Sequence, residues 1–218
     1  VAEAHRLGLR VILDWVANHT SPDARWIEEH PADWYVRDSL GNTIVQYDWT
    51  DIAKLNYDNA DMRQEMERAM RFWLERGIDG FRCDMACEVP IDFWRTTLPA
   101  LRRDYPQIFL LAEGEDPALH EGAFDASYSW ELHHLMNDIA RGKRGVAELK
   151  EYLKKDAANT PREAFRLMFT SNHDENSWAG SEFERMGDAA RVMALLTFTL
   201  PKGMPLDLNR ELVHNPAS

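Results

Sequence analysis

Short apolar runs alternate with longer amphipathic stretches from one end of this chain to the other. The apolar runs, which predict strands, are 9–14, 79–84, 108–113, 123–128, 165–171 and 203–208. Helices are predicted at 59–76, 91–104, 144–156 and 184–199. Strands that alternate with helices are typical of a parallel sheet of βα units, so the sequence predicts an α/β protein.

One connection interrupts this alternation. Residues 20–54 show no strong periodicity but contain Trp26, Trp34, Tyr35, Tyr47 and Trp49. Structureless connections of this length are unusual inside a compact domain and tend to be functional. The aromatic residues suit either a small subdomain core or a ligand surface, and we expect both to be partly true. We predict that one or more of Trp34, Tyr35, Trp49 and Trp178 line a cleft.

Composition narrows the range of partners. The 218 residues are 44% hydrophobic, which suffices for one large domain with a sizeable core. A formal net charge of -12 argues against nucleic acid or an anionic membrane as the main partner. No apolar run approaches the roughly 20 residues of a membrane span. The two cysteines, Cys83 and Cys87, fit no common metal or redox spacing, so we expect both to be buried free thiols.

Polar and charged residues gather where four of the predicted strands end. They are Asp14, Asn18 and His19; Arg82 and Asp84; Glu113; and Asn172, His173, Asp174 and Glu175. The carboxyl ends of parallel strands are where active sites form in βα proteins. Arg82 and Asp84 also share one face of their strand, because side chains alternate. Since unpaired buried charge is costly, packing alone does not account for this pattern.

Four ordered segments carry a family resemblance. "DWVANH", "GFRCDMA", "LLAEGE" and "FTSNHDE" resemble the four signature regions of the alpha-amylase family of glycoside hydrolases (family 13). The resemblance implies a (β/α)8 TIM-barrel catalytic domain over residues 1–218. It further implies that the chain supplies strands three to eight, with a loop-rich inserted subdomain at 20–55 after strand three.

The resemblance also implies roles for the strand-end residues. Asp84 corresponds to the nucleophile, Glu113 to the general acid/base and Asp174 to the transition-state stabiliser. The implied substrate-binding residues are Arg82, which orients the nucleophile, His19, His173, Asn18, Asp14 and Trp178. We predict that the Asp84 and Glu113 carboxyl groups lie roughly 5–6 Å apart, as a retaining mechanism needs.

The expected activity is cleavage of α-1,4-glucosidic bonds in starch, glycogen or malto-oligosaccharides by a retaining double displacement. The alternatives are a non-catalytic or inactive truncated glycan-binding relative and a transglycosylase of the same family. A metal-dependent hydrolase on a barrel would also collect His and Asp at strand ends. It is disfavoured because the two strand-end histidines, His19 and His173, each follow an asparagine, in "ANH" and "SNH", which suits recognition of sugar hydroxyls.

No cofactor is expected for the chemistry. A structural calcium ion is implied in many relatives by the asparagine of the first region, so Asn18 is a candidate calcium ligand. The second region of those relatives usually continues with Lys-His, whereas this chain has "MACEVP", which weakens the case for calcium.

The resemblance also implies that this sequence does not include the first two barrel strands, and Asp207 lies where the resemblance calls for an apolar residue. The runs 9–14 and 203–208 would then be open sheet edges, which favour pairing with another chain. We therefore expect self-association. An extracellular or periplasmic location is favoured slightly over a cytoplasmic one.

Overall fold

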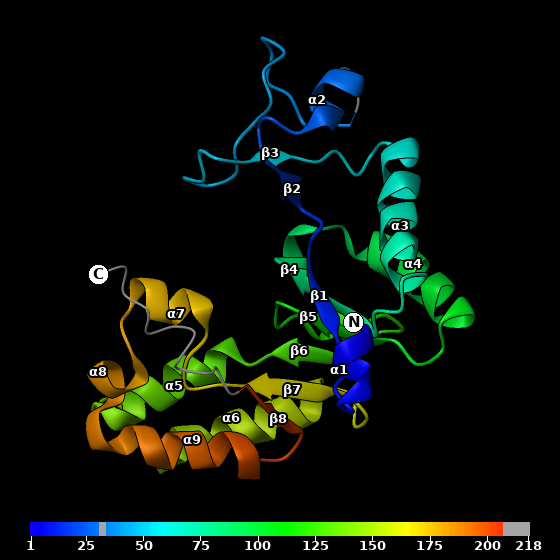
Figure 1. Ribbon diagram of the computed structural model, residues 1–218. Helices are drawn as coiled ribbons and strands as arrows, with labels where there is room; N and C mark the ends of the chain where they lie inside the picture. Colours follow the sequence, from blue (N-terminus) through cyan, green and yellow to red (C-terminus); the bar gives the residue numbers. More distant parts are fainter. Residues whose placement is uncertain (31–33, 207–218) are drawn as a thin grey trace. The chain divides into compact units, whose positions relative to one another are not determined.

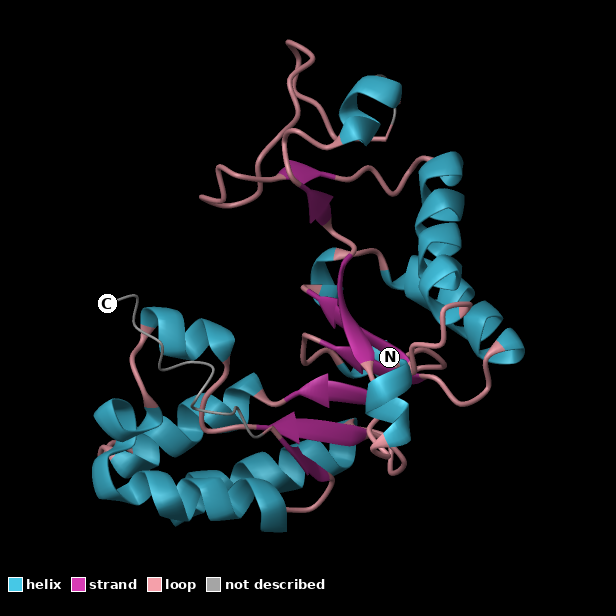
Figure 2. Cartoon of the chain, viewed as in Figure 1, coloured by secondary structure: helices cyan, strands magenta, loops and turns pink. Residues whose placement is uncertain are grey.

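The computed structural model describes residues 1–30 and 34–206, which belong to two compact units, Val1–Phe124 and Asp125–Ser218 (Figure 1; Figure 2). Each unit contains three parallel strands with helices between them along the chain. The predicted α/β class is confirmed. The closure of these strands into a barrel and their numbering as strands three to eight stay predictions, as does the division into one domain with an insert. Within the described residues, no helix is both long and apolar enough to span a membrane.

The first unit begins with a short helix and ends with a 3-10 turn. Its elements are α1 (Ala2–Arg6), β1 (Ile12–Val16), β2 (His19–Thr20), α2 (Arg25–Glu29), β3 (Ala53–Lys54), α3 (Ala60–Leu74), β4 (Gly80–Asp84), η1 (Ala86–Glu88), α4 (Ile91–Asp104), β5 (Phe109–Ala112) and η2 (Pro117–His120). Strand β4 lies between β1 and β5 in a parallel sheet, while β2 and β3 form a separate antiparallel pair.

The register of this sheet brings the charged strand ends level with one another. Asp14 of β1 is opposite Arg82 of β4, and the residue before Glu113 is opposite Cys83. Gly80 makes the close approach of β4 and β5 possible, because a Cβ atom there would lie 1.8 Å from the carbonyl oxygen of Phe109. Any side chain at this position would force the two strands apart.

Helix α3 shows how the sequence builds the core behind this sheet. The Asn59 side chain accepts a hydrogen bond from the Met62 backbone N–H at 2.8 Å and so caps the helix. Met62, Met66, Met70 and Leu74 are buried at helical spacing in the core of this unit. Burying each such side chain contributes roughly 1.5–3 kcal/mol. The helix predicted at 59–76 is confirmed.

The second unit repeats the alternation of strands and helices. Its elements are β6 (Ala126–Tyr128), α5 (Trp130–Ala140), α6 (Val146–Asn159), β7 (Phe165–Met168), α7 (His173–Trp178), α8 (Glu182–Met186), η3 (Gly187–Ala189), α9 (Ala190–Thr199) and β8 (Gly203–Pro205). Strand β7 pairs in parallel with both β6 and β8. A second core packs α5, α6 and α9 against one another through side chains that include Met136, Tyr152 and Met193.

Several elements differ from the sequence prediction, and three of them have a clear local cause. The strand expected at 9–14 is β1, which starts at Ile12, because the left-handed turn at Gly8 (φ 77°) leaves Leu9 exposed. The helix expected at 184–199 is divided into α8 and α9, because Gly187 interrupts it with a φ of 56°. Helix α5 was not predicted, since its buried face includes the polar residues His133 and Asn137. Residues 207 and 208, predicted as strand, lie outside the described residues.

The aromatic segment at 20–54 is partly its own core. The exposed fractions of Trp34 and Tyr35 are 8% and 2%. Trp26 packs edge-on against Trp34, with 5.1 Å between the ring centroids. Tyr35 therefore has little surface with which to line a cleft, and its burial favours the packed-core alternative. Trp34 is also buried, but it lines a cleft of about 520 Å³ together with Trp26 and His30. Of the other two aromatic residues that were predicted to line a cleft, Trp49 is half-buried and Trp178 is 88% exposed.

Candidate active site

Arg82 of strand β4 joins three carboxylates at the strand ends of the first unit. Its Nη1 atom donates to Asp14 Oδ1 at 2.8 Å and to Asp84 Oδ1 at 2.7 Å. Its Nη2 atom lies 2.7 Å from Glu113 Oε2. The Arg82 and Glu113 side chains are each 9% exposed, against 22% for Asp84 and 56% for Asp14. One buried guanidinium group therefore holds Asp84 and Glu113 close together, and it offsets the cost of placing both carboxylates there.

A strained turn after Asp84 contributes a further contact to Glu113. Met85 has a φ of 46°, a left-handed conformation that is uncommon for residues other than glycine. In this conformation its backbone N–H donates to Glu113 Oε2 at 3.1 Å, and the N–H of Ala86 donates to the Glu113 carbonyl at 2.9 Å. Backbone strain of this kind is concentrated at functional sites.

A cleft lies beside these two strand ends. It has a volume of about 330 Å³ and is lined by the turn after β4 and the turn after β5, including Cys87, Glu88 and Asp116. Cys87 is exposed there, so the expectation that both thiols are buried is wrong for this residue. Cys83 is buried, and burial raises the pKa of its thiol. Cys83 lies within strand β4, whereas Cys87 lies in the single turn η1 that follows the strand.

His19 lies in β2, immediately beyond the first strand. Burial lowers the pKa of His19, while the nearby carboxylates of Asp84 and Asp51 oppose this effect. The ring centroid lies 6.0 Å from that of Trp49. The imidazole is therefore held largely neutral, with one nitrogen that donates and one that accepts hydrogen bonds. A ring in this state can bind a sugar hydroxyl.

The surroundings of Asn18 do not fit a calcium ion. Its side-chain nitrogen donates to Gln46 Oε1 at 2.7 Å and lies 3.3 Å from His19 Nδ1, and Gln46 in turn donates to Glu88 Oε2. Calcium requires six to eight oxygen ligands, whereas nitrogen-bound hydrogens engage the oxygens of Gln46 and Glu88 here. Across residues 1–30 and 34–206, no group of three or more His, Cys, Asp or Glu side chains could hold a metal ion.

In the second unit, the expected stabiliser lies at the start of α7. Asn172 caps this helix by accepting a hydrogen bond from the Glu175 N–H at 2.8 Å. His173 Nε2 lies 3.4 Å from Asp174 Oδ2, and these side chains are 57% and 44% exposed. The cap fixes the backbone from which both exposed side chains project.

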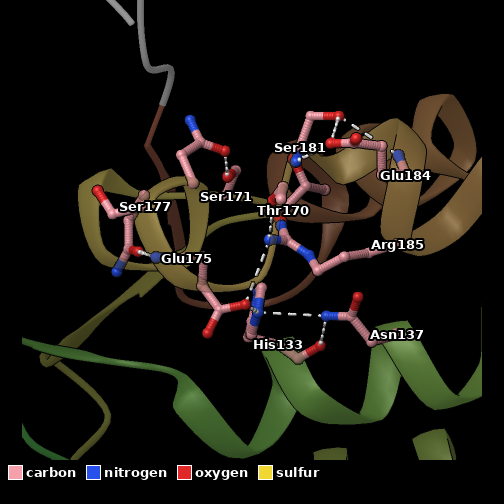
Figure 3. A network of polar contacts seen from close by, with 12 residues as sticks. His133, Asn137, Thr170, Ser171, Glu175, Ser177, Ser181, Glu184 and Arg185 are labelled. Carbon is pink, nitrogen blue, oxygen red and sulfur yellow. Dashed lines mark hydrogen bonds and ion pairs between the residues drawn. The ribbon is translucent and has the colours of Figure 1, made fainter.

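Beneath α7 lies a buried polar network (Figure 3). Glu175 Oε2 lies 3.0 Å from His133 Nε2 and 3.2 Å from Arg185 Nη1. Arg185 also donates to the carbonyl oxygens of Thr170 at 2.5 Å and Gly180 at 2.8 Å. Burial lowers the pKa of His133, opposed by its contact with Glu175. Glu175 thus anchors α7 to α5 and α8 rather than facing outward beside Asp174.

The structure divides the predicted site residues between the two units. Asp14, Asn18, His19, Arg82, Asp84 and Glu113 lie in the first unit, and His173, Asp174 and Trp178 lie in the second. Four of the first group are in contact through Arg82, and we call them the Arg82 cluster: Asp14, Arg82, Asp84 and Glu113. The convergence of Asp174 with Asp84 and Glu113 stays a prediction. Sequence reasoning missed Gln46, Glu88, His133 and Arg185, because no local pattern marks contacts between distant segments.

Comparisons with known proteins agree with the resemblance. Residues 31–206 match the family model for the alpha-amylase catalytic domain. Alpha-amylase MalA of Haloarcula japonica is 29% identical over 216 residues, covering 94% of this chain and 32% of the relative. An alpha-1,4-glucan:maltose-1-phosphate maltosyltransferase of Bifidobacterium longum is 35% identical over 117 residues, covering 50% of this chain and 15% of the relative.

A solved structure shows the same fold. The crystal structure of an alpha-amylase from Lactobacillus plantarum is 30% identical, with a TM-score of 0.85 over 95% of this chain and 52% of that one. The chain thus spans about half the length of that amylase and about a third of the length of MalA. With the family match covering most of the sequence, this chain belongs to the alpha-amylase family of glycoside hydrolases (family 13).

Proposed function

We propose that this chain carries the catalytic carboxylates of a retaining glycosidase that hydrolyses α-1,4-glucosidic bonds in starch, glycogen or malto-oligosaccharides. The observation that supports the proposal most directly is the pairing of Asp84 and Glu113 with the same Arg82 guanidinium. A retaining mechanism needs two carboxyl groups roughly 5–5.5 Å apart, and a shared cation is a simple way to hold them there.

In the first half of the reaction, Asp84 attacks the anomeric carbon while Glu113 protonates the glycosidic oxygen that leaves. Arg82 orients Asp84 for this attack through the hydrogen bond from its Nη1 atom to Asp84 Oδ1 at 2.7 Å. Glu113 needs a proton to act as the acid, so its ion pair with Arg82 has to loosen as the sugar binds. The product of this step is a glycosyl ester on Asp84 and a free alcohol.

In the second half, water attacks the anomeric carbon of the ester, and Glu113 now takes the proton from that water. The carbon–oxygen bond to Asp84 breaks, which returns the free carboxylate and releases a sugar with the original anomeric configuration. Asp174 is proposed to stabilise the positive charge that develops on the sugar ring in both steps. His19 and His173 are proposed to bind hydroxyls of that sugar.

A glycosyl transferase of the same family is the second candidate. The relative from Bifidobacterium longum is named as a maltosyltransferase, and its match covers half of this chain. Transfer would differ from hydrolysis only in the second half, where an acceptor sugar replaces water. An extracellular or periplasmic location is part of the proposal.

The test is to incubate the purified chain with soluble starch and with maltotriose, and to separate the products by chromatography. Hydrolysis predicts sugars shorter than each substrate, while transfer predicts sugars longer than maltotriose. The matched control is Asp84→Asn, which removes the nucleophile with little change in volume. The proposal fails if the wild-type chain gives no products, or if Asp84→Asn turns over at a near-normal rate while circular dichroism shows an intact fold.

A further inference from the structure

A strained turn in segment 20–54 leads back to the end of strand β4. The Trp49 N–H donates to the Gln46 carbonyl at 3.1 Å, which closes a turn over residues 46–49. Tyr47 has a φ of 56° in this turn. A left-handed conformation is a true outlier for a bulky residue and persists only where surrounding contacts hold it.

Glu88 supplies those contacts. The Tyr47 hydroxyl donates to Glu88 Oε1 at 2.6 Å, and the Gln46 side-chain nitrogen donates to Glu88 Oε2. The bond from Tyr47 to Glu88 also raises the pKa of the Tyr47 phenol. Both carboxylate oxygens of Glu88 therefore bind consecutive residues of one turn, and charge-assisted hydrogen bonds of this kind are stronger than neutral ones.

The same contacts continue from Gln46 to His19. An ionised carboxylate only accepts hydrogen bonds, so the end of Gln46 that faces Glu88 is its NH₂ group and the other end is its oxygen. That oxygen accepts from the Asn18 NH₂ group at 2.7 Å. The second hydrogen of this NH₂ group is available to His19 Nδ1, 3.3 Å away. Glu88 thus determines which group donates and which accepts in the contact between Gln46 and Asn18 and in the contact between Asn18 and His19.

We infer that Glu88 is a positioning residue, which holds the turn at 46–49 and, through Gln46 and Asn18, fixes the orientation and tautomer of the His19 ring. With Nδ1 as the acceptor, the proton of the neutral ring lies on Nε2, which becomes a donor for a sugar hydroxyl. The role of His19 toward sugar rests on the proposed function. The contacts from Glu88 to His19 are a property of the fold, and they can be tested without any substrate.

The test uses three variants of the full chain, each followed by melting temperature and by the NMR titration of His19, which is assigned with His19→Gln. Glu88→Met keeps the length of the side chain and removes both of the oxygens that accept from Gln46 and Tyr47. Tyr47→Phe removes one bond to Glu88 and leaves Gln46 in place. Glu75→Gln, an exposed carboxylate at the end of α3, is the matched control for loss of charge.

Glu88→Met is expected to lower the melting temperature by about 2–4 °C relative to Glu75→Gln. It is also expected to raise the pKa of His19, because Asn18 no longer holds the neutral ring. The sign is diagnostic, since Asp84 and Asp51 remain in place and the loss of a negative charge alone would lower that pKa. Tyr47→Phe is expected to lower the melting temperature while leaving the His19 titration unchanged.

An unchanged or lowered His19 pKa in Glu88→Met would overturn the inference, even if the variant is less stable, because the role would then be structural alone. If Glu88→Met does not fold, Gln46→Met replaces it, since methionine keeps the length of the side chain and removes both amide contacts without changing the charge. The same upward shift of the His19 pKa is expected there, and its absence would overturn the inference equally. None of these readouts depends on turnover, so they stand apart from the test of the proposed function.

Discussion

Arg82 and Glu113, on neighbouring parallel strands, form a buried ion pair with 2.7 Å between Nη2 and Oε2. The sequence pointed to Arg82 as the partner of Asp84 alone. Because the same guanidinium also contacts Asp84 and Asp14, its removal would leave three carboxylates without their common cation. The Arg82 cluster is thus a structural unit, and under the proposed function it also holds the catalytic carboxylates.

Substitution of Arg82 should separate these two contributions. Arg82→Gln is expected to lower the free energy of unfolding by about 3 kcal/mol, because it leaves buried carboxylates uncompensated. Arg82→Lys keeps the charge but lacks the second arm of the guanidinium, so it should retain more stability while losing about 100-fold or more in activity. Urea unfolding and a starch assay measure the two effects. Equal loss of stability in both variants would mean that charge is not what Arg82 contributes.

The buried network under α7 predicts a pH dependence. Burial lowers the pKa of His133 in the folded state, so the unfolded chain binds more protons at mildly acidic pH. The stabilisation that comes from a neutral His133 is present above the ordinary histidine pKa of about 6.5 and is lost as the pH falls below it. Urea unfolding between about pH 7.5 and 5 should therefore show a steeper fall for the wild type than for His133→Gln.

The adjacent His134 is the matched control for that measurement, because its side chain is exposed on the same helix. His134→Gln should keep the wild-type pH dependence. If His133→Gln and His134→Gln behave alike, the buried ring does not control the acid side of the stability profile.

Much of the site was visible in the sequence, because residues that end neighbouring parallel strands lie at the same edge of a sheet. Asp84, Arg82 and Glu113 follow from this rule, and helix α4 was predicted with the bounds it has, Ile91–Asp104. The contacts of Glu88 with Gln46 and of Glu175 with His133 were not predictable, because each joins segments about 40 residues apart with no local signal. Cys87 was misjudged for a similar reason, since its exposure depends on the turn at Met85.

Calcium should have little effect on this chain, because the side-chain oxygens of Gln46 and Glu88 near Asn18 accept hydrogen bonds instead of forming an oxygen cage for an ion. The melting temperature is expected to be the same in excess chelator and in millimolar calcium chloride. A ligand at 100 times its dissociation constant would add about 2.7 kcal/mol, which a thermal melt detects easily. A rise of several degrees with calcium, abolished in Asn18→Ala, would show that a calcium site forms there.

Self-association is expected from the sheet edges. Strand β1 has β4 on one side in the first unit, and β8 has β7 on one side in the second. Helix α9 also exposes Val192, Leu195 and Phe198, at 58%, 61% and 64%. Such surfaces favour contact with another chain. Size-exclusion chromatography with light scattering should show dimers or larger species, and a stable monomer across a concentration series would contradict this expectation.

The anomeric configuration of the first sugar released from maltotriose tests the central claim most directly, because it reports whether Asp84 and Glu113 act by double displacement. Proton NMR, recorded before mutarotation equilibrates the product, distinguishes the two anomers. The account predicts the α anomer from the wild-type chain and no product from Asp84→Asn. Initial release of the β anomer would mean a single displacement by water and would contradict the role assigned to Asp84.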